Sequence, residues 1–384
     1  MRVYFDNAAT TPVHPKVFEA MKPFLMEEFG NPSSIHSFGR TVRVAIEEAR
    51  EIVADFINAN PGEIYFTSGG TEANNFAIFG IARTEYAESR RNKIITSKVE
   101  HHCVLDSFQE LERNGFKVHW LNVNSESRIN WQSSSKNFDS STSLVSIMHI
   151  NNETGAINPI EEIAVSVKPK NILFHTDAVQ SFGKIPIDVK KLGVDSLCGS
   201  AHKINGPKGT GFAFVKSGTP LSPLLIGGSQ ERNRRGGTEN VAGIVGFAEA
   251  IKIAKESLLS NYDHAKNLKE KFINGFTAID NNGILINSTP NTSPFILSVT
   301  FKSEFYNNDS ESLLMYLDIN GVAASNGSAC TSGTIKASHV ILGMGYSPED
   351  AAGTLRFSFG RQNTFEEVEY ALEVLNKMAK KFRK

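Results

Sequence analysis

Residues 194–209 read VDSLCGSAHKINGPKG and join a short apolar strand to a His-Lys pair and a turn rich in Gly and Pro. Small residues before the pair let the backbone approach a ligand closely, and Lys203 would emerge at a strand end, where open α/β sheets bind their ligands. The ordinary alternative is an exposed loop lysine. Ser200 and His202 weigh against it, because they add polar groups beside Lys203. The stretch therefore predicts a ligand site at the end of a strand in an α/β fold.

Short apolar or β-branched segments recur on both sides of this strand. They lie at residues 64–67, 93–97, 116–123, 144–150, 172–175 and 211–215. Helical or turn-forming segments separate most of them, and one helix is marked by apolar residues at every third or fourth position from Val42 to Phe56. Strands that alternate with helices indicate βαβ units, so we expect a mainly parallel sheet with helices on both faces.

The pattern changes near residue 255, where two long helices are expected at residues 242–259 and 264–276. The segments that follow are predicted strands at residues 284–287, 295–301, 321–324 and 354–359 and helices at residues 310–317 and 365–382. The sequence therefore predicts a large α/β domain over residues 14–255. A smaller α+β domain is expected over residues 256–384, and we group residues 1–13 with it.

Composition and charge exclude several classes of protein. The 384 residues are 40% hydrophobic, enough for a sizeable core, and the net charge of −1 argues against a nucleic-acid binder. No apolar run approaches the roughly 20 residues of a membrane span, and residues 1–6 lack the apolar stretch of a signal peptide. Cys103, Cys198 and Cys330 form neither a disulfide framework nor a CxxC metal motif. We therefore expect a cytoplasmic protein without nucleic-acid or membrane partners.

A second informative segment is FHTDAVQS at residues 174–181, in which Asp177 ends an apolar strand. An Asp in that place can be a helix N-cap. The alternative is a buried carboxylate that faces a protonated heteroaromatic nitrogen. A lysine that forms a Schiff base, together with an acidic partner for a pyridinium, is typical of pyridoxal phosphate chemistry. The segment TSGGTE at residues 67–72, between a strand and a helix, would then bind the phosphate, although alone it is a weak signal.

Two further segments carry polar groups with more than one interpretation. His101 and His102 precede Cys103, but no further ligands at suitable spacing support a zinc site. His101 stacked on a planar cofactor is favoured over zinc, and a surface histidine at a helix start is the ordinary alternative. Asn152 belongs to the turn NNETG at residues 151–155, which has either simple turn chemistry or contact with a ligand.

The three cysteines differ in their surroundings. Cys330 lies among Ser, Gly, Ala and Thr in residues 324–333, where a thiol should be accessible and available as a nucleophile. Cys198 falls in an apolar strand, where burial should raise its pKa and make it inert. Cys103 is the more credible rival because it follows His101, but it opens a helix and is therefore held in place.

Together these segments resemble the pyridoxal-phosphate-dependent cysteine desulfurases of the NifS/IscS type, within the class V aminotransferase group. The resemblance covers nearly the whole chain and rests on YFDNAATTP (4–12), GNPSSIH (30–36), TSGGTEAN (67–74), VEH (99–101), NNETG (151–155), HTDAVQ (175–180), SAHKINGPKG (200–209), RGGTEN (235–240), GSACTS (327–332) and RFSFG (356–360). It implies fold type I of the pyridoxal phosphate enzymes: a large domain with a mainly parallel sheet between helices, and a smaller α+β domain that carries the cysteine loop.

The resemblance also implies which residues bind the cofactor. Lys203 would form the Schiff base, Asp177 would face the pyridine nitrogen and His101 would stack on the ring. The other residues implied to bind the ring or the phosphate are Gly70, Thr71, Asn152, Gln180, Ser200, His202 and Thr238. Gln180 and Asn152 would lie near the ring hydroxyl. Thr238 would reach the phosphate of the neighbouring subunit's cofactor, so a homodimer is implied.

The implied reaction converts L-cysteine to L-alanine and leaves the sulfur on Cys330 as a persulfide. Lys203, His101 and Cys330 would be catalytic. Arg356 would pair with the substrate carboxylate, which suits the fork geometry of arginine, and Asn152 would lie close by. The sulfur would pass to an acceptor protein, such as an iron–sulfur scaffold or a thiolation protein. No resident metal is implied, although Cys330 could transiently ligate an iron–sulfur cluster.

Some positions depart from the family pattern. Gly70 replaces a common Ala, His102 stands where Lys is common, Cys103 follows it, and residues 232–237 differ from the usual arrangement. None of these changes removes a reacting group. The alternatives are a true class V aminotransferase, a selenocysteine lyase or sulfinate desulfinase, an iron–sulfur scaffold and a pyridoxal-phosphate-binding regulator. The first two alternatives are enzymes of the same fold, and an aminotransferase would not need Cys330. An iron–sulfur scaffold would not explain Lys203 with Asp177, and the sequence shows no DNA-reading helix pair or basic extension for a regulator.

Overall fold

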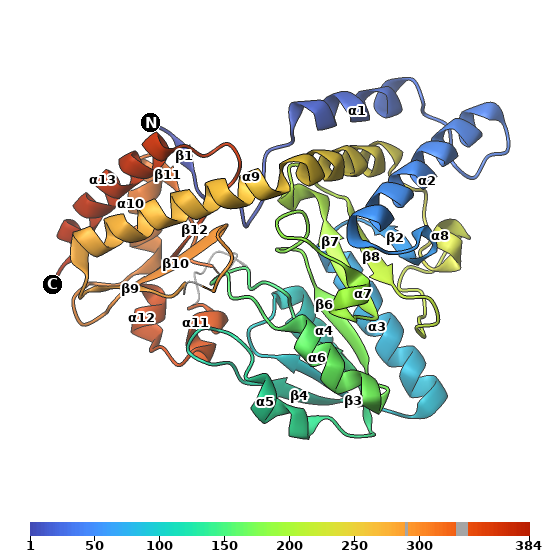
Figure 1. Ribbon diagram of the computed structural model, residues 1–384, viewed down its shortest axis with the longest axis horizontal. Helices are drawn as coiled ribbons and strands as arrows, with labels where there is room; N and C mark the ends of the chain where they lie inside the picture. The colour runs from blue at the N-terminus through green and yellow to red at the C-terminus, as the bar shows by residue number, and fades with distance from the viewer. Residues whose placement is uncertain (289–290, 328–336) are drawn as a thin grey trace.

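The computed structural model describes residues 1–288, 291–327 and 337–384, and Figure 1 shows their arrangement. Its largest sheet has seven strands in the order β2-β8-β7-β6-β5-β3-β4. The strands are β2 (Ile64–Thr67), β3 (Lys93–Ser97), β4 (Lys117–Leu121), β5 (Thr142–Ser146), β6 (Leu173–Asp177), β7 (Ser196–Ser200) and β8 (Gly211–Val215). Strands β4, β3, β5, β6 and β7 are parallel to their neighbours, whereas β8 pairs antiparallel with β7 and β2. The predicted mainly parallel sheet is confirmed.

Helices cover both faces of this sheet. The longer ones are α1 (Pro15–Met26), α2 (Ser37–Ile57), α3 (Gly70–Ser89), α4 (His102–Arg113), α6 (Ile160–Val167) and α9 (Val241–Asp280). Ile94 and Cys198 pack with α3 and α4 in one buried cluster, whereas their neighbours Ile95 and Leu197 pack with α2, α6 and α9 in another. Successive side chains of a strand point to opposite faces, so apolar residues in unbroken runs give a sheet that is buried on both sides.

The C-terminal part contains two smaller sheets. One has the order β12-β10-β9 and is antiparallel, and the other pairs β1 with β11 in parallel. These strands are β1 (Val3–Tyr4), β9 (Ile284–Ile286), β10 (Ile296–Phe301), β11 (Val322–Ala323) and β12 (Thr354–Ser358). The helices beside them are α10 (Ser310–Ile319), α11 (His339–Gly343), α12 (Pro348–Ala352) and α13 (Phe365–Phe382). Phe5 is fully buried in the core of this part, so the first residues of the chain pack with its last third.

Helix α9 corrects one prediction. Residues 242–259 and 264–276 belong to one continuous helix, Val241–Asp280, which runs from the large sheet to the C-terminal part (Figure 1). The polar residues 260–263 interrupt the apolar pattern but include neither Gly nor Pro, so the helix continues. Its buried face changes partners: Ala254 packs in the sheet core, and Ala265 packs in the C-terminal core. The predicted domain boundary at residue 255 falls inside this helix and stays a prediction.

Short helical segments complete the described chain. They are α5 (Trp131–Ser134), α7 (Val189–Leu192), α8 (Gln230–Asn233), η1 (Pro61–Glu63), η2 (Ser135–Asn137), η3 (Lys168–Lys170) and η4 (Ala201–Lys203). Within the described ranges, no helix combines the length and the apolar character needed to cross a membrane.

Candidate active site

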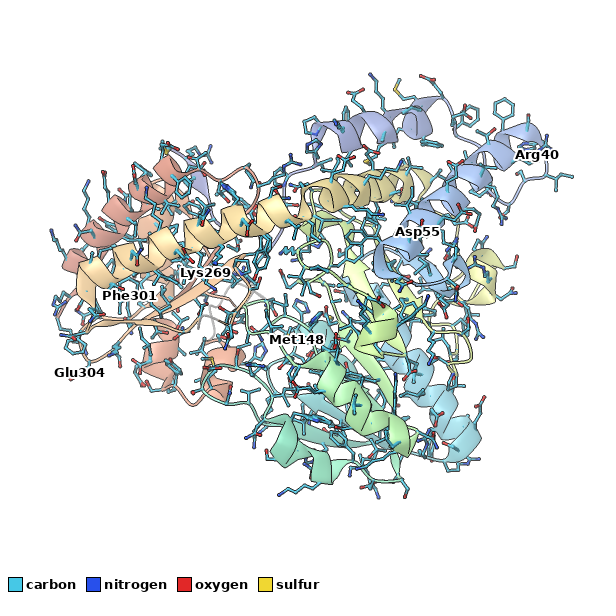
Figure 2. All side chains as sticks on the ribbon, in the orientation of Figure 1. Arg40, Asp55, Met148, Lys269, Phe301 and Glu304 are labelled. Atoms are coloured by element: carbon cyan, nitrogen blue, oxygen red, sulfur yellow. The ribbon has the colours of Figure 1, made fainter. Side chains whose placement is uncertain are left out.

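A cavity of about 570 Å³ lies where the carboxyl ends of the parallel strands meet the C-terminal part. Asp177 and Ser200 end the adjacent strands β6 and β7, so they reach the same edge of the sheet. Met148, labelled in Figure 2, lines the cavity and marks its place between the two parts. The lining includes these residues predicted from the sequence: Gly70, Thr71, His101, Asn152, Asp177, Gln180, Ser200, His202, Lys203 and Arg356.

Two predicted residues are not placed in this cavity. Thr238 lines a separate cavity of about 90 Å³ together with Thr67, Ser68 and Arg235. Its predicted contact with a neighbouring subunit's cofactor stays a prediction. Cys330 lies outside the described residues.

Lys203 projects into the cavity from η4, the short turn that directly follows β7. Its Nζ donates to the carbonyl of Ala8 at 2.5 Å and to the carbonyl of Ala9 at 2.8 Å. Burial lowers the pKa of Lys203 to about 8, and the charge of Arg356 acts in the same direction. A lysine with a lowered pKa has a much larger free-amine fraction at pH 7 than an ordinary lysine, as a Schiff base requires. Lys203 is therefore not an ordinary exposed loop lysine.

Asp177 is only 6% exposed and is held by two neutral donors. Asn74 Nδ2 donates to its Oδ2 at 2.9 Å, and the backbone N–H of Val179 donates to its Oδ1 at 2.9 Å. The residues after Asp177 form turns, so the N-cap interpretation does not apply to a helix here. A carboxylate held by neutral groups at the cavity wall suits a cationic ring nitrogen.

The start of α3 and the end of β7 together form a site for an anion. The first backbone N–H groups of α3, from Gly70 onward, lack partners within the helix. Ser200 Oγ is buried and has no hydrogen-bond partner among the described residues. A Cβ at Gly70 would lie 2.8 Å from Val179 Cγ2, so Gly at this position leaves room that Ala would fill. These donors fit a phosphate at a helix N-terminus.

His101 was predicted either to start a helix or to stack on a planar cofactor. It is the N-cap of α4 and it also lines the cavity, so its position is compatible with both. Its Nδ1 accepts the backbone N–H of Cys103 at 3.2 Å and lies 3.1 Å from Cys103 Sγ. Burial lowers the pKa of His101, while Asp177 acts in the opposite direction. Because Nδ1 is an acceptor, we place the proton of the neutral ring on Nε2.

Arg356 closes the cavity from β12 and is 5% exposed. Its Nη2 pairs with Asp6 Oδ1 at 2.7 Å, and its Nη1 donates to the carbonyl of Asn152 at 2.9 Å. The Nε of Arg356 is buried and has no partner among the described residues. An arginine that Asp6 and Asn152 fix at the cavity wall brings a positive charge that suits an incoming carboxylate.

Some cavity residues were not assigned a role by sequence reasoning. Asp6, Asn74 and Glu153 line the cavity. All three fall within motifs that carry the family resemblance, and Asn74 follows Gly70 by four positions and so shares its helix face. The motifs could therefore have marked these three residues as candidates for the site. The sequence does not indicate which atoms they contact.

Comparisons with known proteins agree with this geometry. Residues 3–371 match the family model described as Aminotransferase class-V. The chain is 47% identical over 386 residues to Cysteine desulfurase IscS of Dictyoglomus turgidum, which covers 99% of this chain and 95% of that protein. It is 44% identical over 375 residues to Putative cysteine desulfurase IscS 1 of Bacillus subtilis, with 96% of each covered.

Two solved structures extend the comparison to the fold. One, described as a NifS-like protein, has a TM-score of 0.91 at 39% identity and covers 100% of both chains. Another, described as SspA in complex with cysteine, has a TM-score of 0.81 at 36% identity and covers 94% of this chain and 99% of that one. The present chain therefore belongs to the class-V aminotransferase family and, within it, to the cysteine desulfurases of the IscS and NifS type.

Proposed function

We propose that this protein uses pyridoxal phosphate to convert L-cysteine to L-alanine and keeps the sulfur on Cys330 as a persulfide. The observation that carries the proposal is the convergence of Lys203, Asp177 and the start of α3 on one cavity. An amine with a lowered pKa, a buried carboxylate and a set of anion donors are the groups that this cofactor requires. The solved relative described as a complex with cysteine supports the choice of substrate.

The cofactor would be held by residues at the ends of three neighbouring elements. Lys203 would bind it covalently, Asp177 would pair with the ring nitrogen, and Gln180 would donate to the ring hydroxyl. Gly70, Thr71, Ser200 and His202 would surround the phosphate. Burial lowers the pKa of His202 to about 4, so this histidine acts as a neutral hydrogen-bonding group. When bound, pyridoxal phosphate supplies an electron sink for negative charge that develops at the substrate Cα.

The substrate would be oriented by its carboxylate. Arg356 brings to the cavity wall a positive charge that Asp6 holds in place. Asn152 lies beside it, because its own carbonyl accepts from Arg356. Arg356 and Lys203 line the same cavity, so a substrate held by its carboxylate would have its Cα within reach of Lys203 Nζ. Lys203 then moves the Cα proton, and the neutral His101 ring beside it accepts or returns a proton during sulfur transfer.

The sulfur would be taken by Cys330. A bond forms between its thiolate and the substrate sulfur while the Cβ–S bond of the substrate breaks, so one L-cysteine and one thiol give one L-alanine and one persulfide. Cys330 lies outside the described residues, but Gly327 before it and His339 after it both line the cavity. The described chain thus reaches the cavity on both sides of residues 328–336, which supports the choice of Cys330.

The test is incubation with L-cysteine while alanine and sulfide are measured together in the presence of a reductant. Equal amounts of both are expected for the wild type, and almost no sulfide is expected for Cys330→Ser. An aminotransferase would not release alanine and sulfide in equal amounts, and it would keep its activity in Cys330→Ser. Cys103→Ser is the matched control, because it also removes one cysteine but is expected to keep sulfide release.

The remaining partners follow from the same proposal. We propose a homodimer in which Thr238 approaches the phosphate of the other subunit's cofactor, since Thr238 lies outside the main cavity of its own chain. The acceptor of the sulfur would be an iron–sulfur scaffold or a thiolation protein. A reactive thiol at Cys330 has to stay reduced, and this supports a cytoplasmic location.

A further inference from the structure

A second buried lysine, Lys184, lies directly behind the proposed cofactor site and has no role in the mechanism above. It is 7% exposed and lines a cavity of about 40 Å³ together with Lys203 and Phe295. Lysine is almost never buried without a partner, because removing its charge from water is costly. The position therefore needs an explanation.

The turn after β6 fixes the position of Lys184. Backbone hydrogen bonds from Lys184 N to Ser181 O at 3.0 Å and from Phe182 N to Ala178 O at 2.8 Å close this turn. Gly183 has a φ of +70°, and a Cβ there would lie 2.6 Å from Ile204 Cγ2. The turn is thus packed against the residue next to Lys203, and Lys184 cannot move away without moving that segment.

Lys184 reaches the active site through one amide. Its Nζ donates to Gln180 Oε1 at 2.9 Å, and Gln180 Nε2 donates to the carbonyl of Ala8 at 2.9 Å. The same carbonyl accepts from Lys203 Nζ at 2.5 Å. Lys184, Gln180, Ala8 and Lys203 therefore form a continuous chain of hydrogen bonds, and Gln180 and Ala8 line the main cavity.

We propose that Lys184 is a positioning residue that fixes the Gln180 amide with its N–H groups toward Ala8 and the cavity. The orientation follows because the Ala8 carbonyl can only accept, so the atom of Gln180 that faces it has to be the nitrogen, and the oxygen is left for Lys184 Nζ. Gln180 then presents a donor to an anionic oxygen, such as the ring oxygen of the cofactor. The inference rests on the proposed function and adds a residue to the same site.

The electrostatic surroundings of Lys184 agree with this role. Burial lowers its pKa to about 7, and the like charges of Lys203 and Arg356 act in the same direction. Arg361 lines the same small cavity, and the Phe295 ring lies 5.7 Å from Nζ. Lys184 is therefore largely neutral above pH 7, and a neutral amine still donates to Gln180 Oε1.

The experiment is a pH titration of the visible absorption band of the purified holoenzyme, which reports the protonation of the nitrogen that Lys203 contributes. In Lys184→Met the midpoint should rise by roughly half a pH unit or more, because Gln180 is no longer held as a donor to the anionic ring oxygen, which then favours a proton beside it. Lys184→Arg keeps a donor to Gln180 Oε1 and should restore the midpoint toward the wild-type value. If Lys184→Met does not fold, Lys184→Leu replaces it. That variant also lacks a donor to Gln180, and its midpoint should also rise.

Lys269→Met is the matched control. Lys269, labelled in Figure 2 on α9, is also buried, its pKa is also lowered by burial to about 7, and its Nζ donates to Thr292 Oγ1 at 2.7 Å. It does not line the main cavity, so its loss should leave the midpoint unchanged. An unchanged midpoint in folded, loaded Lys184→Met or Lys184→Leu, or an equal shift in Lys269→Met, overturns the inference. A wild type without any visible band refutes the proposed function instead.

Discussion

Replacement of Glu100 by Gln should make the protein more stable at neutral and alkaline pH. Glu100 is fully buried, its Oε1 accepts from Ser97 Oγ at 2.8 Å and from Met148 N at 3.0 Å, and its Oε2 has no partner among the described residues. Burial raises its pKa from the ordinary 4.5 to about 8, against the opposing effect of the two hydrogen bonds. The folded protein therefore holds this carboxyl in its neutral form at pH 7.

The sign and size of the effect follow from this pKa. Between pH 4.5 and pH 8 the folded state keeps a proton that the unfolded chain has lost, so the free energy of unfolding falls as the pH rises through this window. Each pH unit corresponds to about 1.4 kcal/mol, which gives a loss of about 3 kcal/mol at pH 7 relative to pH 4.5. Gln has the same shape as the neutral acid and does not titrate, so the variant avoids this loss.

The assay is urea denaturation of the wild type and Glu100→Gln at pH 5, 6, 7 and 8, followed by far-UV circular dichroism. The difference in free energy of unfolding between the two proteins should be small at pH 5 and should grow in favour of the variant up to pH 8. Glu110→Gln is the control. Hydrogen bonds from Asn114 and Arg113 lower the pKa of this exposed carboxyl, so the difference in free energy of unfolding between this variant and the wild type should not change with pH in this range. A difference for Glu100→Gln that stays constant from pH 5 to pH 8 refutes the reasoning.

Three further predictions concern the site. Lys203→Ala should abolish the visible absorption band after reconstitution with pyridoxal phosphate, and a persistent band would mean that another amine binds the cofactor. Arg356→Ala should raise the KM for L-cysteine by roughly 30-fold or more, since losing a buried charge partner costs about 2 kcal/mol or more, while the band persists; an unchanged KM would assign the substrate carboxylate to another residue. Cys103→Ala should keep its sulfide release, because burial raises the pKa of the Cys103 thiol. Mass spectrometry after one turnover without reductant should find the extra sulfur on Cys330, and finding it on Cys103 would contradict the assignment.

Much of the fold was predictable because it depends on local patterns. The strands at residues 93–97 and 211–215 and the helix at residues 365–382 have the predicted bounds. Each is specified by β-branched runs or by apolar periodicity within the segment itself. Helix α9 shows the limit of such patterns. Its polar residues 260–263 look like a break in the sequence, but they lie where the helix passes from one buried cluster to the other.

The site was predictable as a set of residue types at strand ends, but not as a set of contacts. Lys203 and Asp177 stand at the ends of strands that the sequence already indicates. The partners of the site come from far along the chain: Asp6 pairs with Arg356, and Ala8 and Ala9 accept from Lys203. No local pattern relates positions so far apart.

The sequence by itself therefore determined most of the strand and helix pattern, the chemistry of the site and the family to which the chain belongs. The tertiary structure alone decided which polar groups are buried and what they contact. Lys184 and Glu100 illustrate the difference, because a lysine or a glutamate is expected at the surface, and both are buried here. Burial of such a side chain depends on how distant segments of the chain pack around it. The lowered pKa of Lys184 and the raised pKa of Glu100 arise only because those segments exclude water.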